Sequence, residues 1–222
     1  MERIEYRDVI DKTGWQPGPW DDEPDKVQWP DEATGLPCLI VRGPVGGLCG
    51  YVGVLPGHPL HGVDHSDCPK ACGKEWCDHR PEHFLEAHGG ITFAGKCSEI
   101  SREKWEKWRA TLLAPKHQEE ARNYPYGDAA ERLREWKEGL ENYEAWSARC
   151  HARHICHIPA PGDPDDVWWF GFDCAHAGDI CPKMSSYGIR SMSGDHGEVY
   201  RDIAYVAAEC AALAQQLAAR CR

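Results

Sequence analysis

The cysteines and histidines of this chain fall into a few tight groups. The 222 residues include twelve of each type. Thiolates and imidazoles that lie close together bind metal ions, form disulfides or pack as ordinary core residues. Deciding among these uses narrows the chemistry that the protein could perform.

The first group lies in a stretch rich in proline, lysine and glycine, which is typical of a loop. It offers three thiols as zinc ligands, Cys68, Cys72 and Cys77, with the imidazole of His79 or of His83 as the fourth. A tetrahedral zinc ion would replace the apolar core that such a polar loop lacks. We therefore predict a structural zinc site. The spacing is looser than the usual Cys-x2-Cys pattern, and surface thiols or a redox-sensitive pair are the alternatives.

The redox environment favours metal binding over disulfides. Met1 is followed by charged residues rather than by the apolar run of a signal peptide, and no stretch reaches the ~18 apolar residues of a membrane helix. We therefore expect a cytoplasmic protein that has no membrane partner, in which clustered cysteines stay reduced.

A second group follows an apolar stretch at 167–172. It comprises Asp173, Cys174, His176 and Asp179. Side chains that leave a rigid strand for a loop are often functional. Asp173 and His176 could bind a metal ion with an open position, or act as a base and its orienting partner. The alternative is that Cys174 is a small core residue and that the aspartates cap turns.

One further metal site can be made from cysteines of different segments. Cys97, Cys156 and Cys174, with His157, could form a second structural metal site between strands.

Histidines in glycine-rich loops suggest a shared pocket. His58 and His61 lie in one such loop, and His88 precedes Gly89 and Gly90 in another. If strand ends bring these loops together, one polar pocket would be lined by five candidate catalytic residues: His58, His61, His88, Asp173 and His176.

The charge of the chain limits what this pocket could bind. The formal net charge is −11, and no basic run interrupts it. A nucleic-acid polymer is therefore excluded as an expected partner. A small anionic ligand fits a locally positive pocket, and we expect Trp168, Trp169 and Asp179 to contact it.

The elements that must position these residues are mainly strands. Apolar runs at 38–41 and 49–54 flank a glycine-rich turn and predict a hairpin, and 88–95 and 167–172 predict two more strands. Residues 1–35 read as an irregular packed arm, because glycine and proline interrupt them.

A single apolar stripe runs along the C-terminal segment from Ile203 to Leu217, with Asp202 near its start. It predicts a helix. Strands followed by a packed helix, without alternation of the two, predict an α+β fold: a small, mainly antiparallel sheet with the C-terminal helix packed on it.

Residues 101–150 differ from the rest of the chain. Tryptophan and leucine recur there at helical spacing on both sides of a turn at 124–128. We predict a helical hairpin inserted into one core domain made of 1–100 and 151–222.

Several long phrases of the sequence resemble a family of uncharacterised proteins encoded by bacteriophages and by actinobacterial genomes that carry prophages. The phrases are GHPLHGVD at 57–64, HGGITFAG at 88–95, VWWFGFDCAHAGD at 167–179 and YRDIAYV at 200–206. The resemblance implies a phage accessory protein that works in the host cytoplasm, where interference with host defence or nucleotide signalling is a natural task.

Two functions are compatible with these observations. In the first, the pocket activates water, directly or through a metal ion, against a bond in a nucleotide-like molecule. In the second, zinc holds the loops and the pocket sequesters an anionic ligand or contacts a host protein without turnover. The sequence contains no serine nucleophile elbow and no phosphate-cradling loop that would favour the enzyme over the binding module.

Overall fold

The computed structural model describes residues 1–68, 78–97, 155–163, 165–186 and 197–221. The chain divides into two compact units, of which one comprises Met1–Cys97 with His157–Arg222 and the other Ser98–Cys156. The helical hairpin predicted at 101–150 lies outside the described residues, so it and the predicted domain boundaries stay predictions.

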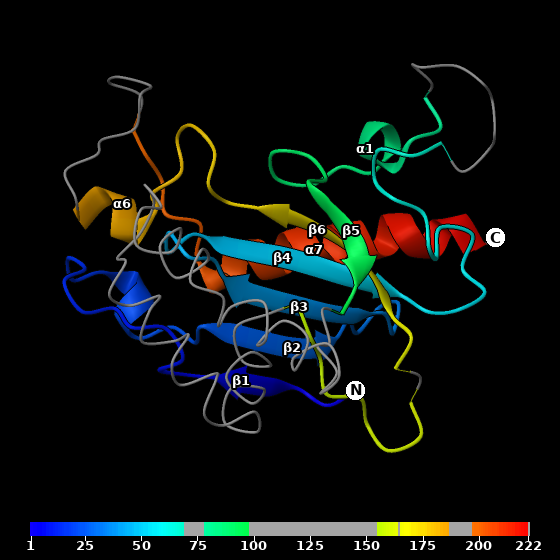
Figure 1. The fold of residues 1–222 in the computed structure, drawn as a ribbon, viewed down its shortest axis with the longest axis horizontal. Coiled ribbons are helices and arrows are strands. Elements are labelled where there is room, and N and C mark those ends of the chain that lie inside the picture. Colours follow the sequence, from blue (N-terminus) through cyan, green and yellow to red (C-terminus); the bar gives the residue numbers. More distant parts are fainter. Residues whose placement is uncertain (69–77, 98–154, 164, 187–196, 222) are drawn as a thin grey trace, which may run out of the picture. The chain divides into compact units, whose positions relative to one another are not determined.

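A six-stranded antiparallel sheet forms the centre of this unit (Figure 1). Its spatial order is β1-β2-β3-β4-β6-β5. The strands are β1 (Ile4–Tyr6), β2 (Lys26–Pro30), β3 (Pro37–Arg42), β4 (Leu48–Val54), β5 (Phe93–Lys96) and β6 (Trp168–Asp173). The predicted hairpin is β3 and β4, and the predicted strand at 167–172 is β6, which lies between β4 and β5.

The C-terminal helix α7 (Ile203–Ala218) packs on β3 and β4, behind the sheet in Figure 1. The Asp202 carboxylate caps its first turn by accepting a hydrogen bond from the Tyr205 N–H. Close packing requires Gly50 on β4, because a Cβ atom there would come within 2.8 Å of the Cys210 sulfur. The predicted α+β fold is thus confirmed.

The other helical segments among the described residues are short: Pro19–Asp21, α1 (Pro81–Phe84), α6 (Pro182–Ser186) and Ala219–Cys221. Across the described residues, no helix has both the length and the apolar character that crossing a membrane would require.

The N-terminal arm is more regular than predicted, because it contributes β1 and β2 to the sheet. A buried charge network attaches this region to the rest of the unit. The side chain of Arg42 is fully buried, and its guanidinium contacts Asp25 at 3.0 Å and Glu23 at 3.1 Å. Glu23 also accepts the N–H of Ile203, the first residue of α7. The N-terminal segment is therefore ordered in two ways: β2 pairs with β3, and the charge network anchors Glu23 and Asp25. Its composition alone suggested a loop.

The antiparallel pairing of β5 with β6 has a direct consequence for the site. Phe93, at the start of β5, pairs with Gly171 near the end of β6. The loop that enters β5 and the loop that leaves β6 therefore meet at one end of the sheet. These loops carry His88 and the segment from Asp173 to Asp179.

Candidate metal centre

The loop that carries His88 is held on α7. The Gln216 side chain accepts the Glu86 N–H at 2.8 Å and donates to the Glu86 carbonyl at 2.8 Å. A turn then closes with a hydrogen bond from the Gly90 N–H to the Ala87 carbonyl. Gly89 has a φ of +68°, and a Cβ atom there would overlap the His176 ring, so the close approach of the two loops depends on glycine.

The loop after β6 is held by hydrogen bonds of its own. The Asp173 carboxylate accepts the Ala175 N–H at 3.1 Å and the Thr92 hydroxyl at 3.1 Å. The Asp179 N–H donates to the His176 carbonyl, and the His176 N–H donates back to the Asp179 carboxylate. This reciprocal pair sets His176 and Asp179 side by side.

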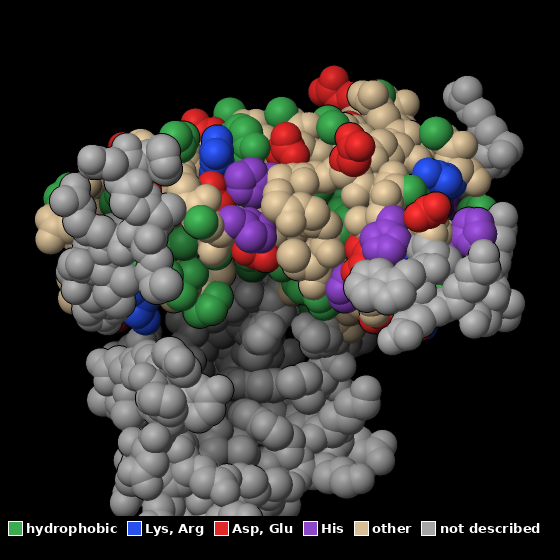
Figure 2. Space-filling model, turned by 90° about the horizontal axis from the view of Figure 1, so that it is seen from above, with side chains coloured by type: hydrophobic (Ala, Val, Ile, Leu, Met, Phe, Trp, Pro, Cys, Tyr) green, Lys and Arg blue, Asp and Glu red, His purple; other side chains and the backbone are tan. Residues whose placement is uncertain are grey.

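Three side chains from these loops converge at one point. His88 Nε2 lies 2.7 Å from Asp179 Oδ2, and His176 Nδ1 lies 3.8 Å from the same oxygen. One ligand atom of each residue lies within 4.8 Å of the other two. Figure 2 shows histidine side chains gathered in two separate places on one face, each beside acidic side chains.

Tyr205, in the first turn of α7, and Arg201, just before that helix, hold the outer atoms of this group. The Tyr205 hydroxyl is 2.9 Å from His88 Nδ1, and Arg201 Nε donates to Asp179 Oδ1 at 2.9 Å. The Arg201 guanidinium also lies over the Tyr205 ring, 4.8 Å from its centre. Metal-binding histidines and carboxylates usually have such outer partners, which fix the ring and the carboxylate in place.

The inner nitrogen of His176 is the unsatisfied atom of the group. His176 Nδ1 is buried and has no hydrogen-bond partner among the described residues. The two nearest carboxylates, of Asp173 and Asp179, lie at 3.9 and 3.8 Å, beyond hydrogen-bonding distance. A cation coordinated by His176 Nδ1 and a carboxylate would give this buried nitrogen the partner that it lacks among the described residues.

The carboxylate of the group stays ionised although it is buried. Burial by itself would raise the pKa of Asp179, but hydrogen bonds from His88, Arg201 and the His176 N–H outweigh it, and its pKa is lowered. Asp179 is thus an anion beside two imidazoles at neutral pH.

His88, His176 and Asp179 therefore form a group that could hold a metal ion. Two imidazoles and one carboxylate suit a divalent transition metal and leave further positions for water or substrate.

Comparison of this chain with protein-family models, with curated proteins and with solved structures finds no match.

The structure brings together three of the five residues predicted to line one pocket, namely His88, Asp173 and His176, and adds Asp179. His58 and His61 lie elsewhere. His58 contacts the Leu217 carbonyl at 3.0 Å, whereas His88 contacts Tyr205. Twelve residues of α7 separate these contacts, which is about 18 Å along the helix.

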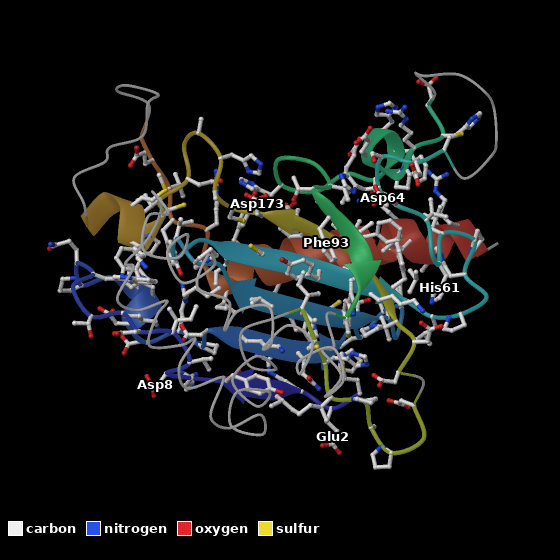
Figure 3. The ribbon with its side chains drawn as sticks, in the orientation of Figure 1. Glu2, Asp8, His61, Asp64, Phe93 and Asp173 are labelled. Carbon is white, nitrogen blue, oxygen red and sulfur yellow. The ribbon has the colours of Figure 1, made fainter. Side chains whose placement is uncertain are left out.

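His61 is held near the beginning of β6 rather than its end. His61 Nε2 lies 3.0 Å from the Asp166 carbonyl oxygen. Figure 3 shows His61 and Asp173 toward opposite ends of the sheet. The prediction that these five residues line one pocket is therefore wrong. The loop after β4 and the loop after β6 leave the sheet at opposite ends, because the two strands are antiparallel.

The two tryptophans predicted to contact a ligand pack within the protein instead. The Trp169 side chain is fully buried and donates its indole N–H to Cys97 Sγ. Trp168 is partly buried and donates to the Val63 carbonyl at 2.9 Å. It lies about 17 Å from Asp173 along β6. Neither tryptophan lies beside the histidine group, so this prediction is corrected.

The predicted cysteine zinc site is only partly described. Cys68 is partly buried and His79 is exposed, while Cys72 and Cys77 lie outside the described residues. This site stays a prediction.

The second cysteine site is not assembled as predicted. Cys174 is buried in the core that α7 covers, and burial raises the pKa of its thiol far above the usual range. Cys97 lies at the other end of β6, where Lys96 pairs with Trp168. A strand of six residues separates the two cysteines, so they do not share a metal ion.

Sequence reasoning missed two members of the candidate metal centre, Arg201 and Tyr205. Both lie in the phrase YRDIAYV, Tyr205 in the first turn of α7 and Arg201 just before the helix begins. The phrase itself offers no signal of their target, because the position of the loop after β6 depends on tertiary structure.

Proposed function

We propose that this protein is a metal-dependent hydrolase that acts on a small anionic, nucleotide-like molecule, with a zinc ion held by His88, His176 and Asp179. The observation that carries the proposal is the convergence of these three ligand atoms within 4.8 Å, with Tyr205 and Arg201 on the outer atoms.

The chemistry follows from the ligand set. A zinc ion with three protein ligands keeps a fourth position for water and lowers the pKa of that water toward 7. Asp173 lies beside the group, 3.9 Å from His176 Nδ1, and is partly exposed. Its carboxylate is placed to accept a proton from an attacking water, as a general base.

Zinc binding requires a change in hydrogen bonding at His88. His88 Nε2 and the Asp179 carboxylate lie within hydrogen-bonding distance, at 2.7 Å. A metal ion bound to both would replace this hydrogen bond, and His88 would then carry its proton on Nδ1. The Tyr205 hydroxyl can either donate to or accept from that nitrogen, so it supports both tautomers.

Arg201 favours an anionic substrate. Its Nε binds Asp179, and its guanidinium makes no other hydrogen bond within the described part of the chain. The side chain is 28% exposed. The remaining N–H groups are available to a phosphate beside the metal ion.

The resemblance to phage proteins supplies the proposed setting. An enzyme of this kind would act in the host cytoplasm and remove a nucleotide-like signal used in host defence. This part of the proposal rests on the resemblance alone.

Metal analysis and turnover test the proposal. Purified protein is stripped with a chelator, reloaded with zinc or manganese and incubated with a panel of cyclic and linear nucleotides. We expect metal-dependent hydrolysis of at least one nucleotide, and its loss in His176→Ala. His61→Ala is the matched control and should keep full activity. Binding without turnover would support the non-catalytic module instead, and failure to bind any metal would contradict both the site and the mechanism.

A further inference from the structure

The segment just before α7 joins the candidate metal centre to the N-terminal arm, residues 1–35. Val199 pairs with the loop after β6, since its N–H donates to the Gly178 carbonyl at 2.9 Å and its carbonyl accepts the Ile180 N–H at 3.1 Å. The next two residues contact different parts of the unit: Tyr200 contacts the arm, and Arg201 contacts the metal centre. The arm and the metal centre are therefore connected through a few residues of chain.

Glu23 supplies the contacts from the arm. One oxygen of its carboxylate, Oε2, accepts the Tyr200 hydroxyl, and the other, Oε1, accepts the Ile203 N–H at 3.1 Å. Arg201 lies between these two residues in the chain. A single side chain of the arm thus holds the backbone on both sides of the arginine that contacts the metal centre.

A buried anchor holds Glu23 and Tyr200 in place. The Arg42 guanidinium donates to Glu23 Oε2 at 3.1 Å and to the Tyr200 hydroxyl at 2.9 Å. The Arg42 side chain is fully buried on β3, and its Nε donates to Asp25 at 3.0 Å. Burial raises the pKa of Tyr200 above its usual range, so the hydroxyl keeps its proton and donates it to Glu23. The sheet therefore sets the position of this contact.

The position of Arg201 matters because of what surrounds it. Its Nε donates to Asp179 Oδ1 at 2.9 Å, and its guanidinium lies over the Tyr205 ring. These contacts fix the outer end of the side chain, whereas the contacts of Glu23 fix the backbone from which it extends. A guanidinium binds a phosphate through a planar pair of N–H groups, so a small displacement weakens that contact.

We infer that Glu23 is a positioning residue that holds Arg201 in place at the candidate metal centre. It acts through the Tyr200 hydroxyl and the Ile203 N–H, and Arg42 keeps it there. The role of Arg201 toward a substrate phosphate rests on the proposed function. The placement of Arg201 by Glu23 does not, and it can be measured without substrate or metal.

The Nε–H of Arg201 reports on this placement. Two-dimensional ¹H–¹⁵N spectra of the chelator-treated, full-length protein record it, and Arg201→Lys, which removes the signal, assigns it. In Glu23→Ala, we expect this proton to exchange with water at least about tenfold faster, because its bond to Asp179 opens more often. An unchanged exchange rate would overturn the inference.

Two further variants separate positioning from a general loss of stability. Tyr200→Phe removes only the hydroxyl and is the test if Glu23→Ala fails to fold. It should speed exchange of the Arg201 Nε–H by about threefold, since Glu23 keeps its bond to Ile203. His58→Ala removes the contact with Leu217 at the other end of α7 and should leave the rate unchanged. No change in Tyr200→Phe, or an equal increase in His58→Ala, would overturn the inference.

Binding of inorganic phosphate gives the functional readout. In protein loaded with one equivalent of zinc, Glu23→Ala should weaken phosphate binding by about tenfold, as measured by calorimetry, which is the value of about one hydrogen bond to a charged group. For a nucleotide that the wild type hydrolyses, KM should rise by a similar factor with a smaller change in kcat. Unchanged phosphate affinity would overturn the inference. A wild type that binds no phosphate and hydrolyses nothing would contradict the proposed function, and the exchange rate of the Arg201 Nε–H would still decide the positioning.

Discussion

Two places in this protein hold histidines from glycine-rich loops against α7, and their surroundings differ. At the C-terminal end of α7, His58 Nδ1 accepts the Leu60 N–H and Nε2 lies 3.0 Å from the Leu217 carbonyl. At the N-terminal end, His88 contacts a hydroxyl and a carboxylate. The first ring is satisfied by backbone atoms and the second by side chains.

The difference separates a structural histidine from a candidate ligand. A ring whose nitrogens both pair with backbone atoms cannot release either of them without leaving an unpaired buried group. A ring beside an ionised carboxylate can exchange its hydrogen bond for a metal ion, because the carboxylate then becomes a ligand as well. The identity of the hydrogen-bond partners, rather than the histidine or its loop, makes the distinction.

The largest expected effect concerns the carboxylate. Asp179→Asn should weaken zinc binding by at least about 100-fold, because the amide removes the anion that two imidazoles and the metal ion share. Competition with a fluorescent zinc chelator measures the affinity. Asp166→Asn, which alters the carboxylate near His61, is the matched control and should bind zinc normally. An equal loss of zinc affinity in both variants would contradict the distinction between the two histidine sites.

For stability, the structural histidine should matter more than the candidate metal ligand. His58→Ala should lower the free energy of unfolding by about 3 kcal/mol, since it leaves the Leu60 N–H unpaired, removes the contact with the Leu217 carbonyl and opens a cavity. His176→Ala should cost under about 1 kcal/mol in chelator-treated protein, because its inner nitrogen has no bond to lose. Urea denaturation of both variants gives the values. A larger loss in His176→Ala than in His58→Ala would show that the assignment is reversed.

The outer partner of His88 should have a smaller effect. Tyr205→Phe removes the hydroxyl at 2.9 Å and should weaken zinc binding about 10- to 100-fold while the thermal midpoint stays close to that of the wild type. The same competition titration applies. Unchanged affinity would mean that the hydroxyl does not orient the ring.

The smallest effect concerns pH. The pKa of Asp179 is lowered in the folded protein, so its ionised form contributes stability that is present above the unfolded pKa near 3.8 and is lost as the pH falls through the folded value. In chelator-treated protein, wild type should therefore be more stable than Asp179→Asn at pH 6, and the difference should shrink toward pH 3. Thermal melts across this range measure it, and a constant difference would contradict an ionised Asp179.

Much of the fold was predictable because the signals are local. The apolar stripe from Ile203 to Leu217 predicts α7, and Asp202 is its N-cap. The runs around the glycine-rich turn predict β3 and β4. The strands β1 and β2 were missed, since their residues become a sheet only through pairing with β3 and through the buried ion pair of Arg42 with Asp25.

The sequence alone determined which residues could do chemistry: His88, Asp173, His176 and Asp179 were all recognisable from their types and from the glycines and strand beside them. Only the tertiary structure decided which of them meet. The pairing of β5 with β6 brings two distant loops to the same end of the sheet. Tyr205 of α7 and Arg201, just before the helix, join them there. The same topology places His58 at the other end of α7. Local patterns contain no information about sheet order, so convergence of distant loops had to come from the fold.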